Sequence, residues 1–66
     1  MLKQYYNKQV NITDNEGRMF TGIIDDYFFP EDNESGVESI VLKTSTGDLY
    51  EFTEMDIQKI IINYVS

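Results

Sequence analysis

Residues 10–29 read VNITDNEGRMFTGIIDDYFF, and this stretch predicts a β-hairpin whose second strand is sharply bent. Val10 and Ile12 alternate with polar residues, which is the period of a half-buried strand. The segment DNEG that follows is typical of a tight turn, because Gly17 can take the positive φ that such a turn requires. Gly22 then interrupts the second strand, and a glycine inside a strand marks a bend or a bulge. We therefore expect Gly22 at the corner of a small barrel.

The rest of the chain continues as short strands separated by polar turns. The acidic stretch PEDNESG at 30–36 predicts a loop, and the spacing of Thr53 and Asp56 resembles a capping box, which predicts a single helical turn. Strict alternation in the second strand puts Ile24 on one face and Tyr27 on the other. The predicted elements are a short helical turn at 2–6, strands at 10–13, 18–29, 37–45, 49–52 and 57–65 (or 59–65), and tight turns at 14–17 and 45–48.

The composition of the chain favours an all-β domain. Ile, Val, Tyr, Phe and Thr supply 26 of the 66 residues, and these side chains suit a pleated sheet. Alanine, the best helix former, is absent. A chain of this length forms one small domain, over 1–66. Five short strands predict a closed or nearly closed barrel, because closure removes exposed sheet edges. We therefore expect an all-β, five-stranded small barrel with a short N-terminal helical turn.

The residue inventory excludes several kinds of chemistry. The chain has neither cysteine nor histidine, so we expect no disulfide framework, no structural zinc site and none of the usual Cys- or His-based nucleophilic mechanisms. Its formal net charge of −7 repels phosphate backbones and anionic membranes. The longest apolar run, at 60–62, is too short to cross a bilayer, and MLKQYY lacks the apolar run of a secretory signal. We expect a non-enzymatic, cytoplasmic protein with no cofactor, no metal and no membrane partner.

Taken together, these residues resemble the Sm-like family, the small barrels that include the Sm, Lsm and Hfq proteins. The resemblance spans 10–62 and consists of barrel-building residues with two glycines at a fixed spacing. It implies a five-stranded barrel that binds RNA and assembles into rings by pairing the fourth strand of one subunit with the fifth strand of the next. In this chain those segments are 48–53 and 59–65. The residues that carry the resemblance are Val10, Ile12, Gly17, Phe20, Gly22, Ile24, Tyr27, Ile40, Leu42, Ile57 and Ile60.

The chain departs from the Sm-like pattern at the positions where that family contacts RNA. Phe28 stands where RNA-binding members carry an acidic residue, and the acidic loop 30–36 occupies the segment that should hold a base-contacting asparagine. The sequence Glu54-Met55-Asp56 replaces the Arg-Gly pair, or short basic motif, that precedes the last strand. We therefore expect an interaction or assembly module that forms a homo-oligomer. RNA binding in the ordinary manner of the family is the alternative.

Three groups of side chains are candidates for a binding or catalytic site. Oxygen ligands around the loop could hold Ca²⁺, but their spacing is not that of an EF-hand, and charge-rich loops are usually solvated. Asp25 and Asp26 are adjacent in a strand, so we expect them to point to opposite faces and not to act as an acid–base pair. The aromatic residues could stack on bases, but the basic residues are scattered, which favours core packing. The residues concerned are Glu31, Asp32, Asn33, Glu34 and Glu38 near the loop, and Tyr5, Tyr6, Tyr27, Phe28, Phe29, Tyr50, Phe52 and Tyr64 among the aromatics.

Two segments, 27–29 and 60–62, are apolar on both faces of their strands. One face of each strand in a small barrel normally meets water, so the outer face of these segments needs a cover. The N-terminal helical turn or another copy of the chain can supply it. We expect self-association through the edges of the fourth and fifth strands, with an internally covered monomer as the alternative. The candidate interface residues are Tyr50, Phe52, Ile60, Ile61, Ile62 and Tyr64.

Overall fold

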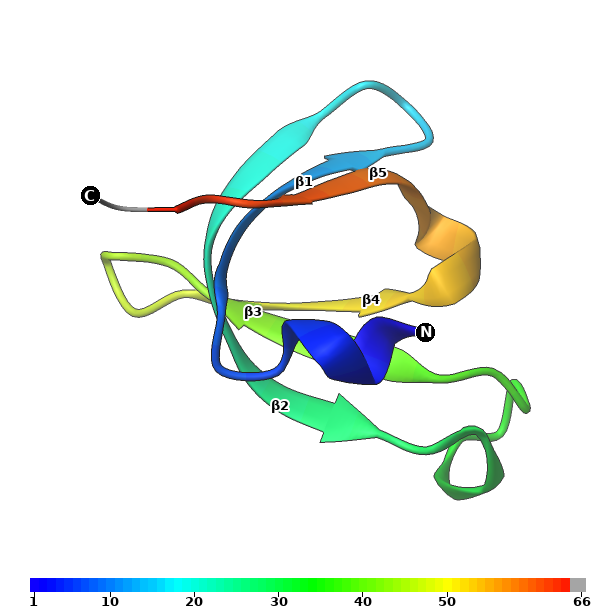
Figure 1. Ribbon diagram of the computed structural model, residues 1–66. Coiled ribbons are helices and arrows are strands. Elements are labelled where there is room, and N and C mark those ends of the chain that lie inside the picture. The colour runs from blue at the N-terminus through cyan, green and yellow to red at the C-terminus, as the bar shows by residue number, and fades with distance from the viewer. Residues whose placement is uncertain (65–66) are drawn as a thin grey trace.

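The protein folds as one antiparallel β-sheet of five strands, which a computed structural model describes for residues 1–64 (Figure 1). The helical pieces in these residues are short 3-10 turns, so the all-β prediction is confirmed. No helix in the same residues is long and apolar enough to span a bilayer. In chain order the elements are η1 (Leu2–Tyr5), β1 (Gln9–Asp14), β2 (Met19–Phe28), η2 (Pro30–Asp32), β3 (Ser39–Lys43), β4 (Leu49–Thr53), η3 (Glu54–Asp56) and β5 (Ile57–Ile62).

The strands follow the order β4-β3-β2-β1-β5, and every neighbouring pair is antiparallel. The sheet curls so that its two edges, β4 and β5, lie on opposite sides of the interior and are joined through η3 (Figure 1). In the described part of the chain these edges are not paired, and the sheet is not closed into a barrel. The sheet is therefore curled but open, which corrects the prediction of a closed barrel. The ring of Phe52 on β4 packs on Phe20 of β2, with ring centroids 5.1 Å apart, inside the open curl.

The core fills the concave side of the curled sheet. Its strand residues come from alternate positions, as expected for one buried face of a sheet. Burying this apolar area is the main favourable term for so small a fold. Leu2 from η1 closes one end of the cluster. The buried apolar residues are Leu2, Val10, Ile12, Ile24, Ile40, Leu42 and Phe52.

Gly22 lies where β2 passes closest to β3. A Cβ atom built on Gly22 would stand 2.3 Å from the carbonyl oxygen of Lys43 and 2.9 Å from the Leu42 side chain. Only glycine therefore allows the two backbones to come this near. The position predicted for the bend is thus a position of close strand approach, and the tight curvature of the sheet depends on it.

A β-bulge in β2 changes which side chains face the core. Ile24 pairs with Leu42 and Asp26 pairs with Val41, so Asp25 is an extra residue without a partner on β3. Both aspartates are exposed, and Tyr27 packs against the core. The predicted alternation is therefore correct up to Ile24 and wrong beyond it, because a bulge places two residues opposite one.

The N-terminal turn η1 is held by a buried carboxylate. Glu38 is only 2% exposed, and it accepts a hydrogen bond from the backbone N–H of Leu2. Burial, followed by the negative charge of the nearby Glu38, raises the pKa of Tyr27 above its ordinary value. The hydrogen bond from Leu2 partly compensates a carboxylate that would be costly to bury alone. The segment 27–29 therefore has its cover in part from η1.

The loop between β2 and β3 is longer than the predicted loop at 30–36, because β2 ends at Phe28 and β3 begins at Ser39. Pro30 starts a short 3-10 turn, since its fixed φ suits the first helical position. Strand β3 begins only at Ser39, because the side-chain amide of Asn33 donates to the Val37 carbonyl at 2.7 Å and draws that residue into the loop.

Candidate functional site

Strand β4 forms one edge of the sheet and has a partner strand on one side only. Leu49 and Tyr50 on this edge expose 61% and 41% of their surfaces. Glu51 between Tyr50 and the buried Phe52 is exposed, and its carboxylate accepts a hydrogen bond of 2.9 Å from the Ser39 hydroxyl. An unpaired edge offers backbone N–H and C=O groups to another strand. The β4 edge is therefore a candidate docking site.

Strand β5 forms the opposite edge, and among residues 1–64 it pairs with β1 alone. Its outward residues Lys59 and Ile61 are exposed, and Tyr64 beyond its end is 87% exposed. This edge combines apolar surface with a single positive charge. It is the second candidate docking site.

The predicted interface residues do not share one environment. Phe52 is a core residue, and its ring lies 5.1 Å from that of Phe20. Three of the six are exposed and two are half-buried against the core. The exposed residues are Tyr50, Ile61 and Tyr64, and the half-buried residues are Ile60 and Ile62. Residue 65, which ends the predicted fifth strand, lies outside the described residues.

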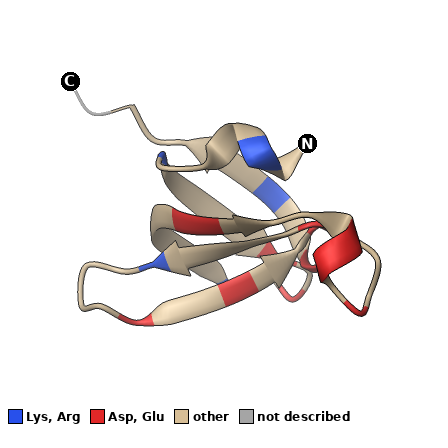
Figure 2. Cartoon of the chain, turned by 90° about the horizontal axis from the view of Figure 1, so that it is seen from below, with Lys and Arg blue, Asp and Glu red and all other residues tan. Residues whose placement is uncertain are grey.

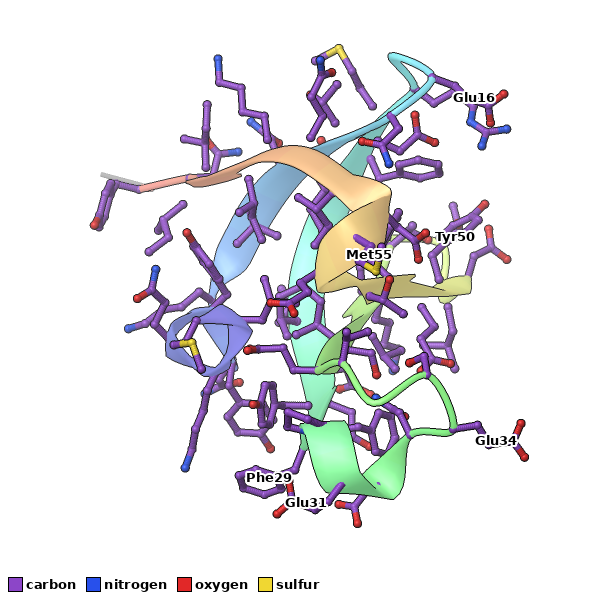
Figure 3. The ribbon with its side chains drawn as sticks, turned by 90° about the vertical axis from the view of Figure 1, so that its right-hand side faces the viewer. Glu16, Phe29, Glu31, Glu34, Tyr50 and Met55 are labelled. Carbon is purple, nitrogen blue, oxygen red and sulfur yellow. The ribbon has the colours of Figure 1, made fainter. Side chains whose placement is uncertain are left out.

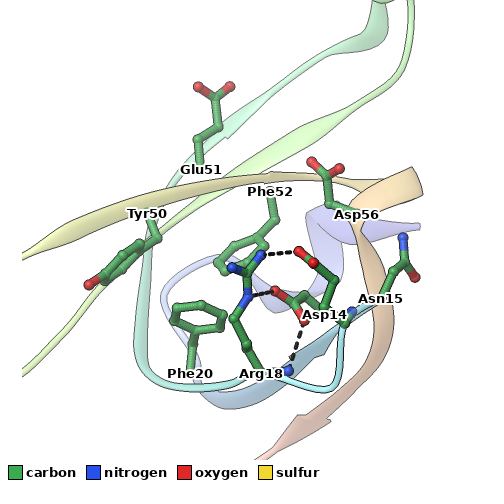
Figure 4. Close-up of a pocket in the computed structure, with 9 residues that line it drawn as sticks. Asp14, Asn15, Arg18, Phe20, Tyr50, Glu51, Phe52 and Asp56 are labelled. Carbon is green, nitrogen blue, oxygen red and sulfur yellow. Dashed lines mark hydrogen bonds and ion pairs between the residues drawn. The ribbon is translucent and has the colours of Figure 1, made fainter.

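A hollow of about 420 Å³ lies beneath the β4 edge, between that strand, η3 and the β1–β2 hairpin (Figure 4). Phe20 and Tyr50 form part of its wall, with ring centroids 5.0 Å apart. The amide of Asn15 donates to the Met55 carbonyl at 2.7 Å and so ties the hairpin to η3. The hollow therefore combines aromatic rings with charged side chains and opens beside the β4 edge. The charged residues that line it are Asp14, Glu16, Arg18, Glu51 and Asp56.

Arg18 and Asp14 form an ion pair at the rim of this hollow (Figure 4). The Arg18 Nε atom donates to Asp14 at 2.7 Å, and the backbone N–H groups of Glu16 and Arg18 donate to the same carboxylate. Burial by itself raises the pKa of Asp14, but these hydrogen bonds and the Arg18 charge outweigh it, so that the pKa is lowered. This pair was not among the predicted site residues, although an acidic residue and an arginine that flank a tight turn are a signal for it.

The aromatic residues at the end of β2 pack on one another and on η1. The rings of Tyr27 and Phe29 meet edge-on at 5.2 Å, and the Lys3 ammonium lies 5.2 Å from the centre of the Phe29 ring. Tyr6 and Phe29 remain partly exposed, at 53% and 45%. The structure places these aromatics in a small surface cluster with one lysine, and not along a basic groove.

The acidic loop holds its carboxylates apart. Glu31 and Glu34 point away from the ribbon into solvent (Figure 3). Asn33 is engaged instead in closing the loop, through its hydrogen bonds to Val37 and Ser39. In residues 1–64 no three acidic side chains gather closely enough to hold a metal ion.

The charges are shared unevenly between the two edges. The segment from 48 to 56, which includes β4 and η3, carries four carboxylates and no basic residue, whereas 57–64 carries one lysine and no carboxylate. Figure 2 shows the wider excess of acidic over basic positions along the strands and turns. The β4 edge is therefore negative and the β5 edge weakly positive.

No protein-family model, no curated protein and no solved structure matches this chain.

Proposed function

We propose that this protein is a non-enzymatic, Sm-like assembly module that self-associates through the β4 and β5 edges of its sheet. The proposal rests on one observation. In residues 1–64 the β4 and β5 edges are both unpaired, and each has exposed apolar side chains. Small β proteins normally protect such edges, because a bare edge invites pairing with another chain. A second copy of the chain supplies that protection here.

Several features of the fold support the Sm-like part of the proposal. The sheet has five strongly curled antiparallel strands, a short N-terminal turn covers one end of the core, and a capping box built by Thr53 and Asp56 makes the turn into β5. The curled strands and the turn into β5 are consistent with the sequence resemblance over 10–62. Pairing of β4 with β5 of a neighbour then provides the closure that the single chain lacks.

The test is a pair of matched substitutions on two equally exposed isoleucines. Ile61 on the β5 edge and Ile23 on the central strand β2 are both 47% exposed. Ile61→Glu places a negative charge in the proposed interface opposite the acidic β4 edge, and we expect the dissociation constant of the oligomer to rise at least about tenfold, the equivalent of roughly 1.4 kcal/mol. Ile23→Glu is the control and leaves association unchanged.

Sedimentation velocity at low and high micromolar concentration measures this effect. A wild-type protein that stays monomeric at high micromolar concentration would contradict the proposal. Equal behaviour of the two glutamate variants would show that association, if it occurs, uses another surface.

RNA binding is distinguished from this proposal by its dependence on salt. An Sm-like RNA binder holds oligo-U or oligo-A at low salt, and its affinity falls steeply as salt is added. With a net charge of −7 and an acidic loop at 30–36, we expect no binding of either oligonucleotide. Tight, salt-sensitive binding would favour the alternative.

A further inference from the structure

Another hollow, of about 410 Å³, lies between the N-terminal turn η1 and the end of β2. This volume is within the range of about 300–1,000 Å³ that is typical of small-ligand sites. Three of the residues that line it are aromatic, and the other two are a lysine and an aspartate. They are Lys3 of η1, Tyr6 at the end of η1, Asp26 and Tyr27 of β2, and Phe29, which follows β2. We call this space the Phe29 hollow.

Two aromatic rings of the Phe29 hollow form a corner. The rings of Tyr27 and Phe29 have an interplanar angle of 85° and centroids 5.2 Å apart, so they stand almost at right angles and are not stacked. Phe29 projects from the start of η2 to the surface (Figure 3), and Phe29 and Tyr6 expose 45% and 53% of their surfaces. The face of an aromatic ring carries a negative electrostatic potential. These partly exposed rings therefore attract cations rather than anions.

A cation of the chain itself already lies at this corner. The Lys3 ammonium is 5.2 Å from the centre of the Phe29 ring, within the distance of about 6 Å at which a ring face attracts a cation. Lys3 is exposed, and the ion pairs in residues 1–64 are those of Arg18, so no carboxylate in that part of the chain holds the lysine in place. Another cation can therefore replace the Lys3 ammonium on the ring.

The charges around the Phe29 hollow also favour a cation. Asp26 is exposed, and its carboxylate accepts a hydrogen bond of 2.8 Å from the backbone N–H of Tyr27, which orients it. Burial raises the pKa of Tyr27 most, and the negative charges of Glu38, Glu31 and Glu54 raise it further, so this ring lies in a negative field. An anionic ligand would have to approach against these carboxylates.

We propose that the Phe29 hollow binds an alkylated ammonium group, which is the chemistry shared by the head of choline and the side chain of a methylated lysine. The positive charge is attracted to the ring faces and to Asp26, and the methyl groups pack on the rings. The unmethylated ammonium of Lys3 is compact and strongly hydrated, so it gains less from the same rings. This inference goes beyond the proposed function, because the hollow is formed by η1 and the end of β2 and not by the β4 and β5 edges.

The probes for the site are choline and the neutral alcohol in which a carbon atom replaces the choline nitrogen. NMR titration of the full chain, followed at the ring signals of Tyr6 and Phe29, gives both dissociation constants. We expect choline to bind at least about fivefold more tightly than the alcohol, because only choline carries the charge that the rings attract. Potassium chloride at the same concentration should leave the ring signals in place. Equal binding of choline and the alcohol, or equal shifts with potassium chloride, would overturn the inference.

A second ligand distinguishes the two sources of the alkylated ammonium group. A short glycine peptide with one trimethyllysine presents the group as a partner protein would. Tighter binding of this peptide than of choline assigns the hollow to a methylated lysine of a partner, and tighter binding of choline assigns it to a small molecule. If neither ligand shifted the ring signals of Tyr6 and Phe29, the inference would be wrong.

Variants of the protein test which residues form the site. Phe29→Leu removes the ring but keeps an apolar side chain, and we expect choline to bind at least about fivefold more weakly. Lys3→Gln removes the competing ammonium, and we expect about threefold tighter binding. Asp26→Asn keeps an acceptor for the backbone N–H but loses the charge, and we expect about threefold weaker binding.

Asp25→Asn is the matched control for Asp26→Asn. Asp25 is the neighbouring exposed carboxylate, and it lines a different hollow, beside Lys43. We expect Asp25→Asn to change choline binding less than about 1.5-fold. Equal losses in the two variants would mean that choline responds to the net charge of the protein alone, and unchanged binding to Phe29→Leu would mean that the rings are not the site. Either result would overturn the inference.

Discussion

A side chain at residue 22 collides with the backbone of β3. The obstructing atom for a Cβ is the Lys43 carbonyl oxygen at 2.3 Å, which cannot rotate away as a flexible side chain would. Overpacking a well-packed site typically costs about 1–3 kcal/mol, and we expect Gly22→Val to lie at the upper end of that range or beyond it. Urea unfolding measures the loss.

Thr21→Val is the control for the substitution at Gly22. Thr21 is adjacent and exposed, and valine has nearly the same shape, so the change removes only an exposed hydrogen bond from the Thr21 hydroxyl to Asn11. An exposed change of this kind usually alters stability by less than about 0.5 kcal/mol. If Gly22→Val and Thr21→Val unfolded at the same urea concentration, the close approach of β2 and β3 would not constrain the fold.

Asp14 links the stability of the hairpin to acid pH. Its pKa is lowered in the folded chain, so its contribution to stability is complete above the ordinary aspartate value of about 3.9 and is lost as the pH falls through the lower folded value. We expect Asp14→Asn to lose less stability than wild type between about pH 4 and pH 2, because asparagine does not titrate. Urea unfolding at several pH values measures the difference.

Glu34 provides the control for Asp14, because it is an exposed carboxylate in the loop. The variant Glu34→Gln should keep the acid dependence of the wild type. An Asp14→Asn variant whose stability falls with acid as steeply as that of the wild type would mean that the Arg18 ion pair has no part in the pH dependence.

At the level of elements, η1 stays docked because Glu38 anchors it. Glu38→Ala leaves the buried N–H of Leu2 without an acceptor, and an unsatisfied buried donor costs about 1–3 kcal/mol. Glu38→Gln keeps an acceptor and should cost less. Hydrogen exchange at the Tyr6 and Lys8 amides measures release of η1, since these amides bond to carbonyls within the N-terminal segment. Faster exchange is expected in the alanine variant, and unchanged exchange would contradict the anchoring role.

The elements could be predicted from the sequence where local signals agree with tertiary packing. The turn glycines and the capping box of Thr53 and Asp56 act over a few residues, and the structure confirms them. The predicted alternation of β2 is confirmed as far as Ile24. The bulge at Asp25 could not be predicted, because it depends on how β2 pairs with β3. The burial of Glu38 likewise depends on η1, which lies 36 residues away in the chain.

For the whole molecule, the composition and the alternation of apolar and polar residues predict an all-β sheet. They do not determine whether β4 and β5 pair to close it. Closure depends on the relative positions of β4 and β5, which are far apart in strand order and which no local sequence signal determines. The candidate site likewise has features that the sequence predicts and features that depend on tertiary packing. The two edge strands could be predicted from the sequence, whereas the core position of Phe52 and the hollow beneath β4 required the folded chain.

The bulge in β2 also determines which changes in chain length this strand tolerates. Ile24 and Tyr27 both face inward because Asp25 and Asp26 together span a single outward position. An in-frame deletion of Asp25 therefore leaves every downstream residue on its present face and straightens the ribbon. Deletion of one residue elsewhere between Met19 and Ile24 turns core-facing side chains toward solvent on one side of the deletion. Asp25 is therefore the one position of β2 at which we expect a residue to be lost without this exchange.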